Sequence, residues 1–376
     1  MSHCQSSAER TQLRVLALPA FARRQSNPFQ ALLYDEVGKL RVEVRDWTYL
    51  SALWRPADIW HFHHPDTVVF PRALWQSLGE TVYMRLLMLW AKLRRIKIIW
   101  TVHDLDSSDG LHPRLEAWFW RYFLAHVDGC IYLTRAGEAL AKARFARLND
   151  IPAYLVPHGG FAPAYANTIS RADARARLNL PQKASVLLHF GLIRPYKNVP
   201  ELIEAFNALP QAGPDEPPRI LLIAGRVVDR DLAERLRALA AHNPNVRLML
   251  EWIPFDDTQL YFNASNLVVL PYRRILNSGT LLLAMSFKRP VLVPDKGVLA
   301  EQQEKFGSDW VRLFTGALQA EDLIDACAWA TSERRSDPTF AGMQWRDVAA
   351  MTRAAYDDVL GDNAKPRAAT PFSAQA

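Results

Sequence analysis

The feature that most constrains this fold is a series of short apolar segments that alternate with helical patterns along 376 residues. Each segment is bounded by polar turns, as expected of a strand buried on both faces of a parallel sheet. The segments lie at 13–19, 59–63, 96–102, 129–133 and 153–157, and then at 185–190, 220–224, 246–250, 267–270 and 290–294. Helical patterns at 199–209, 231–242 and 280–287 separate the later apolar segments from one another. The alternation predicts two tandem α/β domains that meet near residue 165.

Composition excludes several other classes of protein. Hydrophobic residues make up 49% of the chain and charged residues 22%, which is too apolar for a disordered protein. Cys4, Cys130 and Cys327 are far apart, so neither a disulfide framework nor a zinc cluster is predicted. The first residues are polar, and no apolar run approaches the roughly 20 residues of a spanning helix. We therefore expect a cytoplasmic protein.

The formal net charge of +6 indicates an anionic partner. Residues 82–97 are amphipathic and contain no acid, and tryptophans are concentrated in the first third of the chain. The cations of this segment are Arg85, Lys92, Arg94, Arg95 and Lys97. This pattern is typical of peripheral attachment to an anionic membrane surface, although the tryptophans could also be core residues. No nucleic-acid-binding module or continuous basic face is present, so nucleic acid is not an expected partner.

The segment 189–198 carries the clearest chemical signal, because a strand there ends in a glycine loop with two cations. Gly191, Arg194 and Lys197 follow one another at three-residue spacing before the next helix. Ligands bind at the carboxyl ends of parallel strands, where Arg and Lys beside a tight turn can hold a diphosphate. The alternative is a capped loop with two solvated cations.

A second loop, at 270–280, leads from a strand into a helix. Asn277, Ser278, Gly279 and Thr280 stand at the start of that helix, whose free N–H groups and dipole favour an anion. An ordinary N-cap is the alternative. Two such loops in one domain predict that a sugar nucleotide lies across the same sheet edge.

The order of these motifs resembles that of bacterial glycosyltransferases with the GT-B fold, over roughly residues 13 to 310. The motifs are Asn27-Pro28-Phe29-x-x-Leu32-Leu33-Tyr34, Thr101-Val102-His103-Asp104, Pro157-His158-Gly159, Phe190-Gly191-x-x-Arg194-x-x-Lys197, Ala224-Gly225, Ser278-Gly279-Thr280 and Ala284-Met285-x-x-x-x-Pro290-Val291. The resemblance implies an α/β protein with two Rossmann-like domains facing a cleft. Residues 1–165 would bind the acceptor and 166–345 the donor, and a helix at 346–360 would return to the first domain. The tail at 361–376 lacks periodicity and is predicted to be disordered.

The resemblance also implies a metal-independent enzyme without a cofactor. Arg194, Lys197 and the turn at 277–280 would neutralise the leaving diphosphate of a nucleotide-sugar donor. Gly191 and Gly225 would shape the donor loops. His158 would contact the donor or serve as a structural histidine at the hinge, and Glu301 would bind the ribose or be a solvated helix-start residue.

The sequence departs from the large retaining group of these glycosyltransferases at one place. Those enzymes carry two glutamates, eight positions apart, before the Ala-Met motif. Alignment through Ala284-Met285 places Ile275 and Leu283 where those glutamates would stand, and neither can bind a hydroxyl. An inverting transfer is expected instead, and it needs a general base.

Candidate bases and acceptor contacts lie at strand ends of the first domain. We expect Asp104 to be the catalytic base, with His103 beside it, while Asp106 and Asp109 follow in the same loop. Residues predicted to contact the acceptor are Asn27, His61 and His63. His61, His63, His64 and Asp66 could suggest a metal, but no Glu-x-x-His helix accompanies them and no metal site is predicted.

The function expected from the resemblance is addition of one hexose to a polyprenyl-diphosphate-linked oligosaccharide in exopolysaccharide synthesis, at the inner face of the plasma membrane. The overall sequence, including the missing glutamate pair, is similar to that of xanthan-type β-mannosyltransferases. This resemblance implies mannose transfer from GDP-mannose with inversion. The alternatives are a retaining hexosyltransferase that uses a UDP-sugar and a non-catalytic sugar-nucleotide-binding partner.

Overall fold

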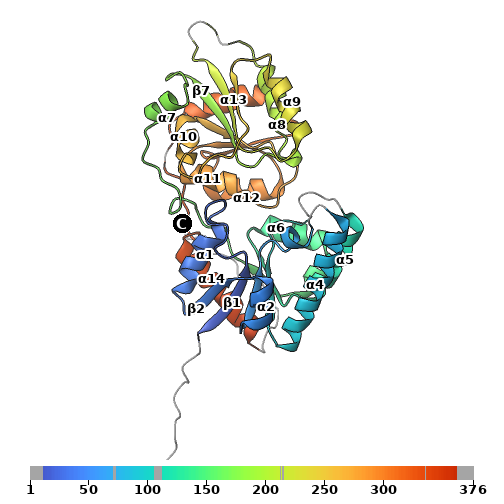
Figure 1. Cartoon of the computed structure of the whole chain (residues 1–376). Coiled ribbons are helices and arrows are strands. Elements are labelled where there is room, and N and C mark those ends of the chain that lie inside the picture. Colours follow the sequence, from blue (N-terminus) through green and yellow to red (C-terminus); the bar gives the residue numbers. More distant parts are fainter. Residues whose placement is uncertain are drawn as a thin grey trace, which may run out of the picture. The chain divides into compact units, whose positions relative to one another are not determined.

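The structure, a computed structural model, describes residues 12–70, 73–105, 112–211, 213, 216–334 and 336–361. The chain divides into two compact units (Figure 1). Unit 1 comprises Met1–Leu133, Glu138–His158 and Trp345–Ala376, and unit 2 comprises Thr134–Gly137 and Gly159–Gln344. The division therefore falls at His158, earlier than the expected residue 165. Phe161 explains the difference, because its N–H donates to Ser286 Oγ of unit 2 at 2.9 Å.

The core of unit 1 is a six-stranded parallel sheet in the order β2-β1-β3-β4-β5-β6. Its strands are β1 (Leu13–Leu18), β2 (Val42–Asp46), β3 (Ile59–Phe62), β4 (Lys97–Thr101), β5 (Gly129–Tyr132) and β6 (Ala153–Leu155). Trp60 and Trp100, which are paired in register with Leu16 and Phe62, are at most 1% exposed. Because all strands are parallel, their carboxyl ends meet at one edge, where His63 and His103 follow β3 and β4.

Helices cover the sheet of unit 1. They are α1 (Phe29–Gly38), α2 (Tyr49–Trp54), α3 (Asp66–Val69), α4 (Leu74–Leu93), α5 (Pro113–His126), α6 (Arg135–Arg144), the 3-10 turn η1 (Ala146–Asp150) and α14 (Trp345–Leu360). The first turn of α6, up to Gly137, belongs to unit 2. Although α14 is remote in sequence, it packs beside α1 (Figure 1). Arg353 of α14 donates to Leu40 O at 2.8 Å, and Tyr154 Oη donates to Asp358 Oδ2 at 2.8 Å. Beyond Gly361, the expected disordered tail lies outside the described residues.

Unit 2 contains a second six-stranded parallel sheet, ordered β12-β11-β10-β7-β8-β9. Its strands are β7 (Ser185–Phe190), β8 (Arg219–Ala224), β9 (Val246–Met249), β10 (Leu267–Val269), β11 (Val291–Pro294) and β12 (Val311–Phe314). Its helices are α7 (Arg171–Arg177), η2 (Pro195–Lys197), α8 (Val199–Asn207), α9 (Arg230–Ala240), α10 (Thr258–Ala264), α11 (Gly279–Ser286), α12 (Gly297–Phe306) and α13 (Ala320–Thr331). The neighbouring strands β7 and β10 precede the two loops that the sequence singled out for phosphate binding.

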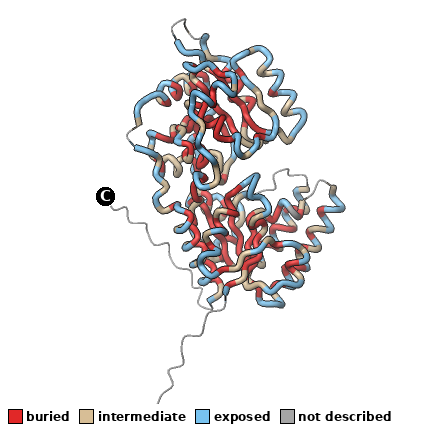
Figure 2. Tube along the Cα trace, turned by 60° about the vertical axis from the view of Figure 1, so that its left-hand side comes forward, coloured by how far each residue is buried: buried red, intermediate tan, exposed pale blue. Residues whose placement is uncertain are grey.

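Burial follows the sheets in each unit (Figure 2). Leu187, Leu221 and Leu267 of unit 2 are at most 1% exposed and belong to one apolar cluster under α8 and α13. Cys130 and Cys327 are buried free thiols. Within the described part of the chain, no helix combines the length and the hydropathy needed to cross a bilayer.

Candidate active site

The two predicted phosphate loops of unit 2 meet at Gly191. This residue has a φ of 104°, and a Cβ placed on it would lie 3.5 Å from both Lys197 Nζ and Thr280 Oγ1. The Arg273 N–H donates to Tyr196 O at 2.9 Å and ties the loops together. A lysine ammonium, a threonine hydroxyl and the start of α11 therefore converge at the edge of one sheet. This arrangement can bind a diphosphate.

Lys197 is a partly buried cation. Its Nζ lies 5.5 Å from the centroid of the Tyr272 ring, and no ion pair in the described residues includes it. Burial, with a smaller contribution from Arg194, lowers the Lys197 pKa to about 8. A desolvated cation without a carboxylate is costly unless an anion binds to it. An anionic ligand bound at Lys197 would offset this cost.

Ser278 begins α11 as its N-cap. Its Oγ accepts a hydrogen bond from the Leu281 N–H at 3.2 Å. The Ser278 hydroxyl is therefore engaged in the cap, whereas the first N–H groups of the helix are provided by Gly279 and Thr280. Asn277 lies half-buried in the loop just before this cap.

Gly225 contributes to the loop through its backbone. It has a φ of 144°, and a Cβ placed there would lie 2.1 Å from Gly191 O. Its N–H donates to Met249 O at 2.9 Å. Gly225 therefore permits the end of β8 to approach the Gly191 loop closely, so the structure supports a shaping role for it.

We expect Gly225→Ala to destabilise the protein by at least about 2 kcal/mol, because the methyl group would clash with backbone at a positive φ. Urea unfolding measures this difference. Gly79→Ala is the matched control, since nothing lies within 4 Å of its Cβ position in α4. A helix-interior Gly→Ala change should stabilise by about 0.5–1 kcal/mol. Equal unfolding midpoints for the two variants would contradict the packing described here.

Glu301 occupies a position that sequence reasoning did not foresee. Its carboxylate accepts hydrogen bonds from the N–H groups of Arg135 at 3.0 Å and Ala136 at 2.8 Å, all three within unit 2. Both oxygens are engaged at the start of α6, which is a favourable place for a negative charge. Ribose binding by Glu301 stays a prediction and would require these oxygens to share their hydrogen bonds.

The predicted catalytic and acceptor residues of unit 1 include a cluster of histidines. His61 Nδ1 lies 2.9 Å from Tyr34 Oη and 2.7 Å from Tyr356 Oη, and its Nε2 lies 2.7 Å from Thr101 Oγ1. Tyr34 Oη also lies 2.6 Å from His63 Nε2. All of these side chains are buried. His61 is thus surrounded by three hydroxyl groups, which favours a positioning role over the predicted contact with an acceptor.

His63 links this buried cluster to the end of β4. Its Nδ1 lies 3.0 Å from His103 Nε2, and the His64 ring stacks on His103 at 4.6 Å between centroids. Burial lowers the pKa of His61 to about 3 and of His64 to about 4. Burial, followed by neighbouring imidazoles, also lowers the pKa of His63 and His103. The rings are therefore neutral at pH 7.

Asp104 is the exposed member of this region. Its side chain is 56% exposed, and its Oδ2 lies 3.7 Å from His64 Nδ1. Asp66, at the start of α3, is buried, and its burial followed by the charge of Asp104 raises the Asp66 pKa to about 7. Sequence reasoning considered Asp66 only as a metal ligand. Two carboxyl groups, those of Asp66 and Asp104, thus lie at the ends of the neighbouring strands β3 and β4, whereas Asp106 and Asp109 lie outside the described residues.

The remaining predicted residues have simpler surroundings. Asn27 is exposed, and its Oδ1 accepts from the Phe29 N–H at 3.3 Å just before α1. His158 belongs to unit 1, where its ring lies 4.3 Å from that of Phe29 and 6.1 Å from that of Trp345. Their predicted roles remain predictions. Where the structure describes the chain, no cluster of three His, Cys, Asp or Glu side chains suits a metal ion.

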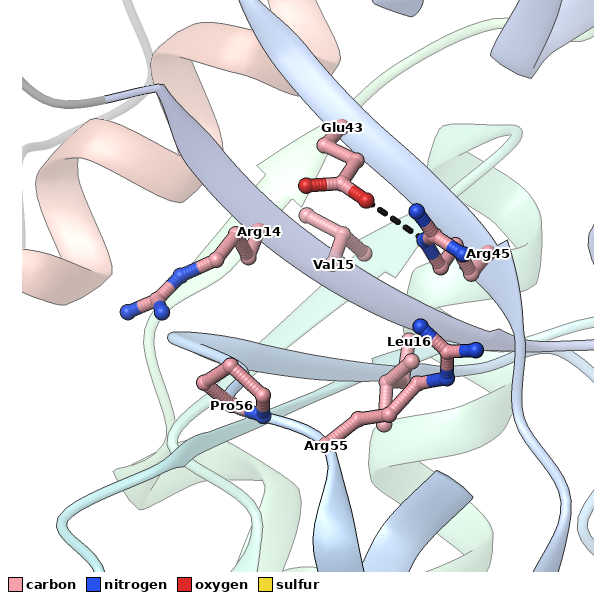
Figure 3. Close-up of a pocket in the computed structure, with 7 residues that line it drawn as sticks. All are labelled: Arg14, Val15, Leu16, Glu43, Arg45, Arg55 and Pro56. Atoms are coloured by element: carbon pink, nitrogen blue, oxygen red, sulfur yellow. Dashed lines mark hydrogen bonds and ion pairs between the residues drawn. The ribbon is translucent and has the colours of Figure 1, made fainter.

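A small hollow lies elsewhere in unit 1, on β1 and β2 (Figure 3). Its volume is about 60 Å³, and it is lined by Arg14, Val15, Leu16, Glu43, Arg45, Arg55 and Pro56. Arg14 pairs with Asp58 at 2.9 Å and Arg45 with Glu43 at 2.5 Å. The hollow is too small for a sugar nucleotide, and none of the predicted site residues lines it.

Comparison with known proteins assigns unit 2 to a protein family. Residues 170–338 match the family described as "Glycosyl transferases group 1", and this range includes both predicted phosphate loops. Unit 2 carries a group 1 glycosyltransferase domain. The predicted enzyme class, glycosyltransferase, is therefore confirmed.

Relatives and solved structures extend the comparison to most of the glycosyltransferase chain. A GDP-mannose:glycolipid 4-beta-D-mannosyltransferase from Xanthomonas campestris pv. campestris is 26% identical over 343 residues, or 89% of each chain. A glycosyltransferase from Rickettsia africae superimposes with a TM-score of 0.62 at 12% identity, over 94% of this chain and 100% of that one. HepE from Anabaena in complex with UDP-glucose gives 0.60 at 13% identity, over 92% and 98%. The GT-B fold predicted from the motifs is confirmed.

Proposed function

We propose that this glycosyltransferase transfers mannose from GDP-mannose to a lipid-linked oligosaccharide, with inversion at the anomeric carbon, during exopolysaccharide synthesis. The observation that carries the proposal is the convergence of Lys197, Thr280 and the start of α11 at Gly191. The curated relative supports the choice of GDP-mannose as donor and of a glycolipid as acceptor, because its name includes both.

The proposed reaction is a single displacement. A hydroxyl oxygen of the acceptor forms a bond to the anomeric carbon while the bond from that carbon to the diphosphate oxygen breaks. The hydroxyl proton passes to the Asp104 carboxylate, and the charge that develops on GDP is stabilised by Lys197, Arg194 and the α11 N-terminus. Neutral His103 precedes Asp104 in the chain, just after β4.

The absence of the glutamate pair supports inversion. Leu283 is only 6% exposed within α11, and Ile275 is half-buried in the preceding loop. Neither side chain can accept a hydrogen bond from a sugar or ribose hydroxyl. The donor site therefore differs from that of the retaining enzymes at the two positions that define them.

Thermal stabilisation by nucleotide sugars tests the donor assignment. A ligand at 100 times its Kd stabilises the folded state by about 2.7 kcal/mol. We expect GDP-mannose to raise the melting temperature of the wild type and of Lys183→Ala, an exposed lysine of the same unit, but not of Lys197→Ala. A response only to UDP-sugars would favour the retaining alternative. The absence of any response would contradict the proposed donor site.

We also propose that the enzyme attaches to an anionic membrane surface at the inner face of the plasma membrane, through an apolar stripe on α4. The stripe consists of Trp75, Leu78, Val82, Leu86, Leu89 and Leu93, which recur every three or four residues and are all exposed. The opposite face of α4 is buried in the protein. Leu50 and Trp54 of α2, a helix that packs against α4, are 73% and 78% exposed.

The charges around this apolar stripe favour a membrane over a protein partner. Arg55 follows α2, and Arg94 and Arg95 follow α4, all exposed. Lys92 and Lys97 pair with Asp128 at 2.7 and 3.8 Å, so the local charge is smaller than the segment 82–97 alone indicates. Leucines and tryptophans flanked by arginines suit the boundary between acyl chains and anionic headgroups.

Vesicle binding tests the apolar stripe. We expect Leu78→Ser, Leu86→Ser and Leu93→Ser combined to weaken co-sedimentation with vesicles rich in phosphatidylglycerol at least about tenfold, because three leucines no longer enter the bilayer. GDP-mannose stabilisation should be unchanged. A control combining Leu140→Ser and Trp252→Ser removes exposed apolar groups elsewhere. Equal vesicle binding by both variants, or loss of a dimer in place of vesicle binding, would contradict membrane attachment through the stripe.

A further inference from the structure

A continuous series of hydrogen-bonding groups leads from the interior of unit 1 to the predicted catalytic region. We call it the histidine chain; its members in order are Thr101, His61, Tyr34, His63 and His103, with contacts of 2.7, 2.9, 2.6 and 3.0 Å between successive side chains. The first four are at most 2% exposed. A neutral imidazole has one N–H and one bare nitrogen, so each ring passes on the direction of the hydrogen bond that it receives.

Thr101 determines the hydrogen-bond direction at the buried end of the histidine chain. The only hydrogen-bond contact of its hydroxyl in the described residues is with His61 Nε2 at 2.7 Å. If the His61 ring donated this bond, the buried hydroxyl proton would lack an acceptor, at a cost of about 1–3 kcal/mol. If Thr101 donates, both groups are satisfied. His61 Nε2 is therefore the acceptor, and the ring proton of His61 resides on Nδ1.

Tyr34 transmits this direction. With its proton on Nδ1, His61 donates to a tyrosine oxygen, and both Tyr34 Oη and Tyr356 Oη are within reach. Tyr34 and Tyr356 also hydrogen-bond one another. Once His61 Nδ1 is a donor, the Tyr356 hydroxyl donates to Tyr34 Oη, and the Tyr34 hydroxyl proton goes to His63 Nε2. Their separation of 2.6 Å agrees with this assignment, because O–H donors form shorter hydrogen bonds than N–H donors. His63 consequently carries its own proton on Nδ1.

The last step reaches His103. The His63 Nδ1–H donates to His103 Nε2 across 3.0 Å, so that nitrogen is an acceptor. We propose that the histidine chain holds neutral His103 as the tautomer with its proton on Nδ1. His103 is then a hydrogen-bond donor at Nδ1 and is not the general base.

This inference rests on the proposed function, and it distinguishes between the two predicted catalytic residues. A neutral ring whose Nε2 already accepts a hydrogen bond and whose Nδ1 carries the proton cannot remove a proton from the acceptor sugar. The role of base then falls to Asp104, whose carboxylate is exposed at the same strand end. Tyr34 and His63 are positioning residues, because they act through His103.

Long-range ¹H–¹⁵N NMR spectra of the full chain, labelled at histidine, test the tautomer directly. We expect His103 to carry its proton on Nδ1 at pH 7 in the wild type. Tyr34→Phe cuts the chain, and Thr101→Val removes its first donor while keeping the side-chain shape. Both variants should shift His103 towards the other tautomer and lower kcat by about 10- to 100-fold without changing the KM for the donor.

Matched controls separate this role from simple stabilisation of the fold. Tyr154→Phe removes a hydroxyl bonded to Asp358, and Thr352→Val removes a buried hydroxyl bonded to Val348 O, both outside the chain. Neither should alter the His103 spectrum. A wild-type His103 with its proton on Nε2, or an unchanged tautomer in both Tyr34→Phe and Thr101→Val, would overturn the inference. Full activity of Asp104→Asn would instead refute the base assignment of the proposed function, whatever the tautomer.

Discussion

Lys197→Ala is expected to lower kcat/KM for mannose transfer by about 10²- to 10³-fold, because removing one preorganised group that stabilises developing charge typically has this effect. Lys197 Nζ is the one ammonium shown to converge with Thr280 at Gly191 within the described residues. Steady-state kinetics with GDP-mannose measure the change. Arg194→Ala should be impaired in the same direction, whereas Lys183→Ala should retain wild-type activity.

The acidity of Lys197 gives a second readout of the same prediction. Its pKa is lowered to about 8 by burial, so the ammonium loses its proton as pH rises through that value. GDP binding should therefore weaken above about pH 8 and take up protons near that pH, because the anion stabilises the charged lysine. Calorimetry in buffers of different ionisation enthalpy measures this uptake. Full activity of Lys197→Ala, or unchanged proton uptake in it, would contradict the diphosphate assignment.

Asp104→Asn is expected to lower kcat by about 10²- to 10⁴-fold, the usual contribution of a general base, while stabilisation by GDP-mannose is retained. An amide preserves the shape of the carboxylate but cannot accept the hydroxyl proton. Single-turnover transfer at saturating donor measures the chemical step. Asp150→Asn is the control, since Asp150 is a 65% exposed aspartate of unit 1 paired with Arg147.

Asp66 is the alternative candidate for the general base. Its pKa is raised to about 7, chiefly by burial. If Asp66 were the base, transfer would increase as pH rises through about 7, and Asp66→Asn would abolish it while Asp104→Asn retained activity. That pair of results would reassign the base within the same strand-end region.

The fold was largely predictable because central parallel strands appear as continuous apolar runs. Two strands were missed, β2 (Val42–Asp46) and β12 (Val311–Phe314). Both lie at sheet edges, where one side of the strand is unpaired and several side chains are partly exposed. Sequences such as Val-Glu-Val-Arg-Asp therefore lack the apolar continuity by which buried strands are recognised.

The donor loops were predictable for a different reason, namely that their groups are close in sequence. Gly191 to Lys197 and Asn277 to Thr280 each follow a single strand, and parallel pairing brings strand ends together. The surroundings of the histidine chain were not predictable in full. Tyr356, which lies outside the histidine chain, contacts His61 across 295 residues, and no local pattern connects α14 to β3.

The solvent exposure of individual side chains was also not predictable from the sequence. The sequence of this region predicts an amphipathic helix but does not show which of its apolar residues are exposed to solvent. Only the structure distinguishes buried Met84 and Met88 from exposed Leu86 and Leu93. Likewise, Glu301 has the chemistry to bind a ribose, but the structure shows both of its oxygens at the start of α6.

The most direct test of the proposed activity is the anomeric configuration of the product. Purified enzyme would be incubated with GDP-mannose and a lipid-linked oligosaccharide, and the new glycosidic bond examined by NMR. We predict that mannose is transferred and that its anomeric configuration is inverted relative to GDP-mannose. Transfer with retention, or transfer of a sugar from a UDP-linked donor in preference to mannose, would contradict the proposal.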